Sequence, residues 1–464
     1  MAGGRVPQSG ADGDSARDML EQNGIETIRV EWSDLHGLAR GKRLSRGRFL
    51  EVLEEGMPQS TAPLFMDLRG ETGAAGKRFE DAGWPDMLAV PDVATLRPVP
   101  YEPGTAVVTA DLHGADGREM ASAPRHVLRR VLDRLQERGW AFQVAAELEF
   151  YLFEAEDHAR LPPGKQALRT RLGREERRAL SRMWTALADM GFGVEGSYAE
   201  DGPGQFEVNI RRADPLRSAD EAFLFRNVVK EIAAQEGLLA TFMAKPLANE
   251  SGNGFHVHLG VDQDAAKHDL GDCGAVSQPS PNGPSSGSPR TEACRQCRAF
   301  VAGQLAFAGE AAAIYLPTVN SYKRILTRGP VPLHVNWSQD NRTAAVRLIR
   351  CPGEPIRVEN RIAGADANPY LLIAVVLASG MLGVEAGLDP GDPLTGHVQH
   401  AADPGARLPG SLTAALPELK RSRALREWLG DEFVEDFVAL KSQEAWRFEA
   451  AVTDWETDEY ASYL

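Results

Sequence analysis

Four short segments of the chain place charged or amide side chains at every second position, between apolar residues. They are AELEFYLF with Glu147 and Glu149, GPGQFEVNI with Gln205, Glu207 and Asn209, GFHVHLG with His256 and His258, and IRVENRI with Arg357, Glu359 and Arg361. A β-strand turns residues i and i+2 to the same face, about 7 Å apart. We therefore expect four strands, each burying an apolar face and presenting acids, imidazoles or guanidinium groups on the other. The outer face of a half-solvated sheet would alternate too, but such faces usually carry Lys, which is absent here.

The carboxylates of these segments suggest a metal site. Glu200 lies seven residues before Glu207, across a Gly202–Pro203–Gly204 turn, so that five glutamates and one histidine could meet. Clustered carboxylates repel one another unless a cation compensates them. An oxygen-rich shell with one imidazole suits Mg²⁺ or Mn²⁺ rather than Zn²⁺.

Basic residues accumulate in the same part of the chain, although each alone would be read as a solvated surface charge. They are Lys245, Lys323, Arg324, Arg342, Arg347, Arg357 and Arg361. Cations beside a metal cluster are suited to an anionic, phosphate-bearing substrate. No Walker-type or Rossmann glycine pattern is present, so a nucleotide would bind in another way.

The surrounding sequence predicts an α+β protein of two domains. Residues 1–16 are rich in Gly, Ser and Asp and are expected to be a disordered tail. Residues 17–108 are expected to form a small domain that begins with a half-buried strand at Ile28–Trp32, and residues 109–464 a larger one, with Ala106–Ala110 marking the crossing. Helices are predicted at 124–138, 174–190, 219–236, 298–314 and 368–387 and near the C-terminus, and a flexible insertion at about 262–295.

Composition excludes several classes of protein. The formal charge of −15 argues against nucleic acid or anionic lipid as the main partner. The apolar stretch Ile373–Leu382 is too short to span a membrane and is read as part of a core helix. Only four cysteines occur, which is typical of a reducing compartment. We therefore expect a cytoplasmic protein without nucleic-acid or membrane partners.

Taken in order, these segments resemble the motifs of the glutamine synthetase type I family. The matching segments are Glu147-Leu-Glu149, Glu200-Asp-Gly-Pro-Gly-Gln-Phe-Glu207, Lys245-Pro246, Gly254-Phe-His256-Val-His258, Asn320-Ser-Tyr-Lys-Arg324, Asn341-Arg342 with Arg347, and Arg357-Val-Glu359-Asn-Arg361. The resemblance implies an N-terminal β-grasp domain and a catalytic domain with a curved antiparallel sheet flanked by helices. It also implies a homododecamer of two stacked hexameric rings.

The resemblance further implies a role for each matched residue. Glu149, Glu200 and Glu207 would hold one Mg²⁺ or Mn²⁺, and Glu147, His256 and Glu359 another. His258, Lys245, Arg347 and Arg357 would contact ATP, while Gly252, Arg324 and Arg361 would bind L-glutamate. His256, Arg324, Arg342 and Glu359 would take part in catalysis. ATP would convert glutamate to γ-glutamyl phosphate, which an amine then attacks with release of phosphate.

Two departures from the family pattern bear on the amine. Ammonia-using members carry an Asp-Gly-Ser-Ser loop, which is replaced here by residues 57–67, and a flap glutamate, whereas no carboxylate occurs between Arg324 and Asp340. Pro330 and the apolar Val331–Leu333 stand near the expected place of that glutamate. We therefore expect a glutamate–amine ligase that uses a polyamine, a monoamine or an ethanolamine-like amine. The alternatives are a glutamine synthetase that uses ammonia, helped by Asp67 or another acid, and a non-catalytic structural or regulatory relative.

Overall fold

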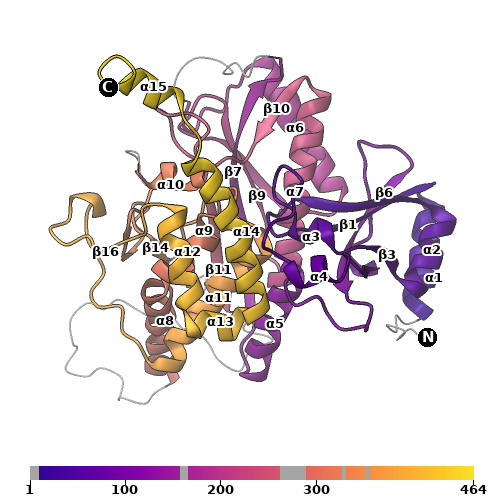
Figure 1. Cartoon of the computed structure of the whole chain (residues 1–464), viewed down its shortest axis with the longest axis horizontal. Coiled ribbons are helices and arrows are strands. Elements are labelled where there is room, and N and C mark those ends of the chain that lie inside the picture. Colours follow the sequence, from indigo (N-terminus) through magenta and orange to yellow (C-terminus); the bar gives the residue numbers. More distant parts are fainter. Residues whose placement is uncertain (1–9, 157–165, 262–288, 327–330, 351–355) are drawn as a thin grey trace.

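The N-terminal domain is built on one sheet, which Figure 1 shows at the side of the larger domain. The computed structural model describes residues 10–156, 166–261, 289–326, 331–350 and 356–464. In this domain the described strands are β1 (Thr27–Ser33), β2 (Ala39–Ser45), β3 (Met57–Ser60), β4 (Asp86–Pro91), β5 (Arg97–Pro98) and β6 (Thr105–His113), ordered β2-β1-β6-β4-β3 with β5 beside β6. The helical elements are α1 (Gly10–Gln22), α2 (Arg46–Glu55), α3 (Ala62–Phe65), α4 (Lys77–Asp81) and η1 (Val93–Thr95). Helix α2 packs on the sheet and α1 packs on α2.

The first strand is more deeply buried than its alternating sequence predicts. Ile28, Val30 and Trp32 enter the core as expected, but Arg29 and Glu31 on the opposite face are also only 8 % exposed. Their burial has a physical cause, because Arg29 donates hydrogen bonds to Glu31 at 2.7 Å and to Glu231 of the larger domain at 2.7 and 2.9 Å. The half-buried strand that we expected is therefore covered on both faces.

The boundary between the domains lies later than the predicted residue 108. Strand β6 pairs in parallel with β1 and antiparallel with β4, so it belongs wholly to the N-terminal sheet. The larger domain begins with helix α5 (Pro124–Glu137), which starts at the proline we predicted for it. Two further expectations need correction. Helix α1 begins at Gly10, inside the expected tail, and helix α8 begins at Pro289, inside the expected insertion; residues 1–9 and 262–288 lie outside the described residues.

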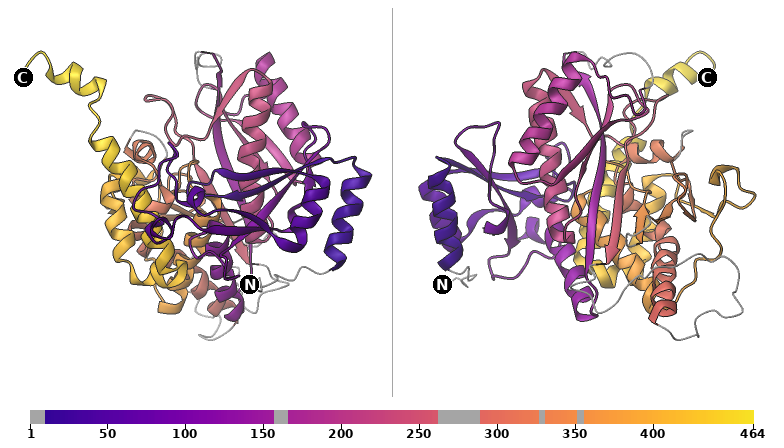
Figure 2. Two further views of the ribbon diagram at one scale, coloured as in Figure 1. Left: turned by 45° about the vertical axis from the view of Figure 1, so that its right-hand side comes forward. Right: turned by 180° about the vertical axis from the view of Figure 1, so that it is seen from behind.

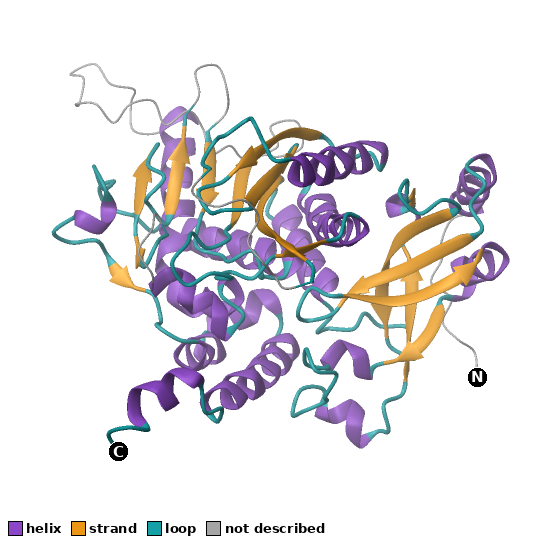
Figure 3. Ribbon diagram, turned by 90° about the horizontal axis from the view of Figure 1, so that it is seen from above, coloured by secondary structure: helices purple, strands orange, loops and turns teal. Residues whose placement is uncertain are grey.

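The larger domain contains a second, mostly antiparallel sheet with one parallel pair, β13 with β14. Its described strands are β7 (Phe142–Glu154), β8 (Val194–Ala199), β9 (Gln205–Ile210), β10 (Leu238–Thr241), β11 (Phe255–Val261), β13 (Trp337–Gln339), β14 (Val346–Ile349) and β15 (Arg357–Asn360), ordered β13-β14-β15-β11-β7-β9-β8 with β10 beside β7. A separate short pair joins β12 (His334–Val335) to β16 (Ala406–Arg407). Figure 3 shows most helices of this domain on one side of the large sheet.

These helices include the ones that the sequence predicted. They are α6 (Arg174–Asp189), α7 (Pro215–Gln235), α8 (Pro289–Ala306), α9 (Ala308–Tyr315), α10 (Val319–Leu326), α11 (Pro369–Ala386), η2 (Val398–His400), α12 (Leu412–Arg421), α13 (Arg423–Leu429), α14 (Asp431–Glu449) and α15 (Asp454–Tyr460). Helix α7 packs directly on β7 and β10. The helix predicted at 298–314 is divided into two helices, because the helical conformation is interrupted at Phe307, between α8 and α9.

Helix α11 forms the centre of the core. Asn368 caps its N-terminus by accepting hydrogen bonds from the backbone N–H groups of Tyr370 and Leu371, and Gly387 ends it in a left-handed conformation with φ of 60°. Among the described helices it alone is long and apolar enough to span a membrane, but 78 % of its most apolar window is buried inside the molecule. It packs against α8, α5 and α7, so α11 is a core helix.

The C-terminal helices connect the two domains. Asp436 of α14 accepts hydrogen bonds from the hydroxyl of Ser122 at 2.6 Å, the backbone N–H of Gly76 at 3.1 Å and the guanidinium of Arg78 at 3.0 Å. Beyond α14, helix α15 projects from the body of the molecule in two different views (Figures 1 and 2). Trp455 is 63 % exposed there, and Tyr463, the second-to-last residue, is 86 % exposed.

Candidate active site

The register of the large sheet gathers the predicted site residues on one face. Strand β7 is central, with β11 on one side and β9 on the other. Directly paired residues are Glu147 with His256, Glu149 with Glu207, and His258 with Glu359. Opposed residues of an antiparallel pair point to the same face. The alternating segments therefore form one continuous surface, as the sequence predicts.

A cavity of about 640 Å³ opens over this surface. Of the predicted site residues, its described lining includes Glu147, Glu149, Glu200, Glu207, Lys245, Gly252, His256, Arg324, Arg342 and Arg361. Four others, His258, Arg347, Arg357 and Glu359, are not among the described residues that line it. The structure thus brings most of the predicted residues to one cavity, while their individual roles remain predictions.

Three glutamates form an acidic cluster on one side of the cavity. Burial, with repulsion from Glu147, Glu149 and Glu200, raises the pKa of Glu207 to about 10. Burial, with repulsion from Glu149 and Glu147, raises the pKa of Glu200 to about 7. Glu149 accepts hydrogen bonds from the backbone N–H of Gly254 at 2.7 Å and from Gln205 at 3.2 Å. Carboxylates crowded in this way are a suitable donor set for a divalent cation.

On the other side of the cavity, two imidazole side chains contact Glu147. Glu147 contacts Nδ1 of His256 at 2.7 Å and Nε2 of His258 at 3.0 Å. Although burial alone would raise it, hydrogen bonds from the two histidines hold the pKa of Glu147 well below its usual range. Burial alone would also raise the pKa of Glu359. Its interactions with Arg361 and the two histidines outweigh this effect and lower the pKa to about 2. Both carboxylates are therefore ionised and able to bind a cation at neutral pH.

The compact group on this side differs from the predicted one. The ligand atoms of Glu147, His258 and Glu359 lie within 4.8 Å of one another, whereas we had grouped His256 with the two glutamates and assigned His258 to ATP. Nδ1 of His258 is buried without a hydrogen-bond partner among the described residues. Both histidines thus remain available for the second metal or for ATP.

Basic side chains border the acidic groups. Arg347 contacts Glu359 at 3.0 Å, and Arg361 also pairs with this carboxylate. Arg324 is held by a hydrogen bond of 2.9 Å from Nη1 to the backbone oxygen of Ile362. Arg324 is only 3 % exposed, and burial lowers its pKa to about 10, so that its guanidinium remains charged at neutral pH. Such buried cations can bind carboxylate or phosphate oxygens.

Tyr198 and Leu168 also line the cavity, although neither was foreseen. Tyr198 lies on β8 opposite Glu207 and two residues before Glu200, so the alternation that identified the acids also extended to it. Leu168 lies in a loop, has a φ of 59° and is 73 % exposed. Nothing in the local pattern of the sequence indicated Leu168, because its place depends on the path of the loop. Val331, which we had considered for the amine, also lines the cavity, whereas Pro330 lies outside the described residues.

Comparisons with known proteins agree with this arrangement. The family described as "Glutamine synthetase, catalytic domain" matches residues 121–460. A glutamate–isopropylamine ligase of Pseudomonas sp is 34 % identical, with 97 % of each chain covered. A gamma-glutamylethanolamide synthetase of Streptomyces coelicolor is 35 % identical, covering 97 % of this chain and 96 % of its own. A glutamine synthetase of Methanococcus maripaludis is 31 % identical over 96 % of this chain and 98 % of its own.

Solved structures extend the likeness to the whole fold. A structure titled "Apo GmaS without ligand" has a TM-score of 0.82 at 28 % identity, over 96 % of this chain and 98 % of its own. A GmaS complex with ADP has a TM-score of 0.80 at 28 % identity, over 97 % and 99 %. The N-terminal sheet domain and the larger domain are therefore shared with these structures.

Proposed function

The chain belongs to the glutamine synthetase family and is an ATP-dependent glutamate ligase, and we propose that it couples glutamate to an organic amine rather than to ammonia. In this reaction ATP phosphorylates the side-chain carboxylate of glutamate, which gives γ-glutamyl phosphate and ADP. The amine nitrogen then attacks the acyl carbon, and phosphate leaves. The amide product, ADP, phosphate and the proton released by the amine complete the reaction.

We assign the first step to the charged part of the cavity. Glu149, Glu200 and Glu207 would hold one Mg²⁺ or Mn²⁺, and Glu147 with Glu359 and a histidine a second. Bound there, divalent cations would neutralise charge on the phosphate oxygens.

The basic residues would complete this step. Arg324 and Arg361 would hold the carboxylates of glutamate, with Gly252 beside them. Arg342 would stabilise the transferring phosphoryl group, and Lys245 would lie beside the phosphates. Arg347 and Arg357 would contact ATP from outside the described lining.

One observation carries the choice of amine: Leu168 and Val331 give the cavity an apolar part beside its charged residues. An ammonium ion needs negative groups that bind it and accept its proton, whereas the carbon chain of a larger amine gains from apolar contact. The acid nearest in sequence to the missing loop, Asp67, is committed elsewhere. It is 1 % exposed, accepts hydrogen bonds from the backbone N–H groups of Arg69 and Glu71, and pairs with Arg447.

Ammonia remains the main alternative substrate, because glutamine synthetases are also found among the relatives. A non-catalytic role is less well supported, since a purely structural protein has no need of the buried acidic cluster. The distinction between the two ligase activities rests on which amine reacts fastest.

The test is a comparison of kcat/KM for ammonium, methylamine, ethanolamine, isopropylamine, putrescine and spermidine at equal concentrations of free amine. Each buried methylene contributes about 0.8 kcal/mol, or roughly a fourfold preference. We expect at least one organic amine to exceed ammonia clearly, with ATP and L-glutamate required throughout. Leu168→Ala and Val331→Ala should reduce that preference, whereas Leu172→Ala, outside the described lining, should not. If ammonia gives the highest kcat/KM, the enzyme is a glutamine synthetase.

We also propose that the enzyme is a cytoplasmic homododecamer of two hexameric rings. Support comes from the projecting C-terminal segment, because its exposed aromatic side chains are typical of a surface that another subunit covers. Light scattering should give a particle of ring size. An active monomer would contradict this assembly.

A further inference from the structure

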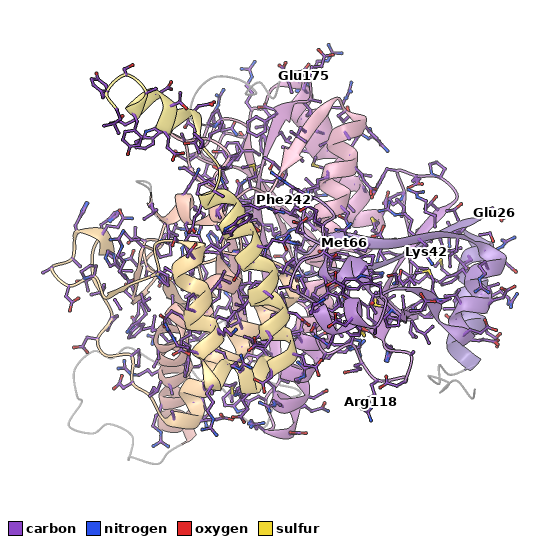
Figure 4. The ribbon with its side chains drawn as sticks, viewed as in Figure 1. Glu26, Lys42, Met66, Arg118, Glu175 and Phe242 are labelled. Carbon is purple, nitrogen blue, oxygen red and sulfur yellow. The ribbon has the colours of Figure 1, made fainter. Side chains whose placement is uncertain are left out.

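A second cavity lies at the junction of the two domains, and we call it the junction cavity. Its volume is about 370 Å³. The N-terminal domain contributes the turn His36–Leu38 and Leu68, and the larger domain contributes residues of α7, β10, α10 and α14. Figure 4 labels Phe242, one of its lining residues. None of the residues predicted for the active site lines this cavity.

The wall of the junction cavity is largely apolar and open to solvent. Phe242, Leu38 and Val319 line it, together with Met243 and Leu68, which are 46 % and 56 % exposed. Met243 and Leu68 are therefore among the most exposed large apolar side chains of the described protein, and both belong to the same cavity. A small molecule with a carbon skeleton could bury these surfaces.

Three residues that line the junction cavity each have a buried polar atom without a hydrogen-bond partner among the described residues. Two of these atoms, Nε of Arg226 and Nδ2 of Asn227, are donors, whereas the third, Oδ1 of Asp366, is an acceptor. Arg226 itself is only 6 % exposed, and its Nη2 donates to the backbone oxygens of Ala365 and Ala367. Buried donors without partners cost stability, which a bound ligand that accepts hydrogen bonds would recover.

The charges around the junction cavity favour an anion. Arg226, Lys230 and Lys441 are cationic, whereas Asp366 and Glu444 are anionic, which leaves one positive charge in excess. The two acids are already engaged: Asp366 accepts hydrogen bonds from Thr318 and Ser321 at 2.7 Å, and Glu444 accepts from Lys441 at 3.2 Å and from the backbone N–H of Val319. Lys230 is an exposed residue of the lining, with its ammonium 5.8 Å from the ring centre of Phe242.

We propose that the junction cavity binds a small carboxylate with an apolar carbon skeleton. The carboxylate lies between Arg226, Asn227 and Lys230, and the carbon skeleton packs on Phe242 and Met243. An apolar α-amino acid and a short branched fatty acid share this chemistry, and both are of a size that the cavity accommodates.

The junction cavity is connected to the active site by α10. Asn320, at the start of this helix, lines the junction cavity and is hydrogen-bonded through its amide to the backbone N–H and oxygen of Lys245, at 2.8 and 3.0 Å. Lys245 lines the active-site cavity, as does Arg324 further along α10. A ligand that shifts Asn320 therefore moves two residues of the active site. Occupancy of the junction cavity regulates the ligase through this connection. This regulatory role rests on the proposed function, whereas binding of the carboxylate to the cavity is independent of it.

The binding experiment is calorimetry of the full-length enzyme with L-leucine, isovalerate and isovaleramide, the last being the uncharged counterpart. We expect L-leucine, isovalerate or both to bind once per chain with a Kd of roughly 0.1–10 mM, and isovaleramide at least tenfold more weakly. Comparison of the two carboxylates shows whether the amino group is required. Lys230→Gln should weaken binding at least fivefold, and Met243→Trp, which fills the mouth, should abolish it. Leu239→Trp is the matched control, since Leu239 is a similarly exposed residue of β10 outside the described lining.

Three results would overturn this proposal. They are the absence of binding by both carboxylates, unchanged binding in Met243→Trp with an unchanged melting temperature, or displacement of the carboxylate by L-glutamate, which would place it in the active site. The kinetic readout is the KM for glutamate, which the carboxylate should shift at least twofold in the wild type and not in Met243→Trp. Binding without such a shift would retain the site and refute its regulatory role. An inactive enzyme that still binds the carboxylate would refute the proposed function instead.

Discussion

Glu207 offers a direct test of the electrostatics of the acidic cluster. Its carboxyl group stays protonated in the folded, metal-free protein up to about pH 10, whereas in the unfolded chain it ionises near pH 4.5. A group whose pKa is higher in the folded than in the unfolded state stabilises the protein at pH values below its unfolded-state pKa. This stabilisation is lost as the pH rises towards the folded-state pKa. The loss is roughly 1.4 kcal/mol for every pH unit in this window, and at most about 5 kcal/mol by about pH 8.

Glu207→Gln replaces the acid by a neutral group of the same shape, which does not titrate. In EDTA the variant should therefore be more stable than the wild type above about pH 6, by a margin that grows with pH. Mg²⁺ should reverse this order, because it stabilises only the form that binds it. The assay is urea unfolding from pH 5 to pH 9 with EDTA or Mg²⁺, and Glu195→Gln, whose side chain is 54 % exposed, is the control. Parallel pH curves for Glu207→Gln and the wild type in EDTA would refute the reasoning.

Three further substitutions probe catalysis, the core and the connection between domains. Glu149→Gln should lower ATP-dependent γ-glutamylation by orders of magnitude with an unchanged melting temperature, and wild-type turnover at saturating Mg²⁺ would remove Glu149 from the metal site. Gly303→Ala should cost roughly 1–3 kcal/mol in urea unfolding, because a Cβ there would lie 2.1 Å from a backbone oxygen of α11, whereas Gly309→Ala in α9 meets nothing within 4 Å and should gain up to about 1 kcal/mol. Asp436→Asn should cost about 1–3 kcal/mol by weakening three hydrogen-bonded contacts, and a loss no larger than that of the exposed Asp431→Asn would contradict the assigned role.

Local signals predicted the elements, and long-range contacts determined what the sequence did not show. Helix α5 starts at Pro124 and α11 lies between Asn368 and Gly387, because proline, asparagine and glycine act within a few residues. The burial of Arg29 could not be predicted in this way, since its partner Glu231 is 202 residues away. The end of the N-terminal domain was missed for the same reason: only the pairing of β6 with β1 and β4 shows where that sheet ends.

For the active site too, local patterns predicted some features and long-range contacts determined the others. Alternation predicted which glutamates and histidines share a face, because that depends on the strand alone. How closely the histidines approach Glu147 and Glu359 depends on the register between strands. His256 lies 2.7 and 3.9 Å from these two carboxylates and His258 3.0 and 3.9 Å, so the structure leaves both histidines in place for the second metal. Leu168 was missed because an exposed loop residue has no periodic neighbour to indicate it.

The contacts of Asp436 also determine when the protein can complete its folding during synthesis. Its partners Gly76, Arg78 and Ser122 leave the ribosome first, and they precede Asp436 by 314 to 360 residues. Strands β1 to β6 can pair as soon as they emerge, but the polar groups that dock on α14 must stay hydrated until almost the whole chain has been translated. The first domain to be made is thus among the last parts to reach its final structure. A nascent chain that stalls before α14 would leave this surface uncovered, where chaperones could recognise it.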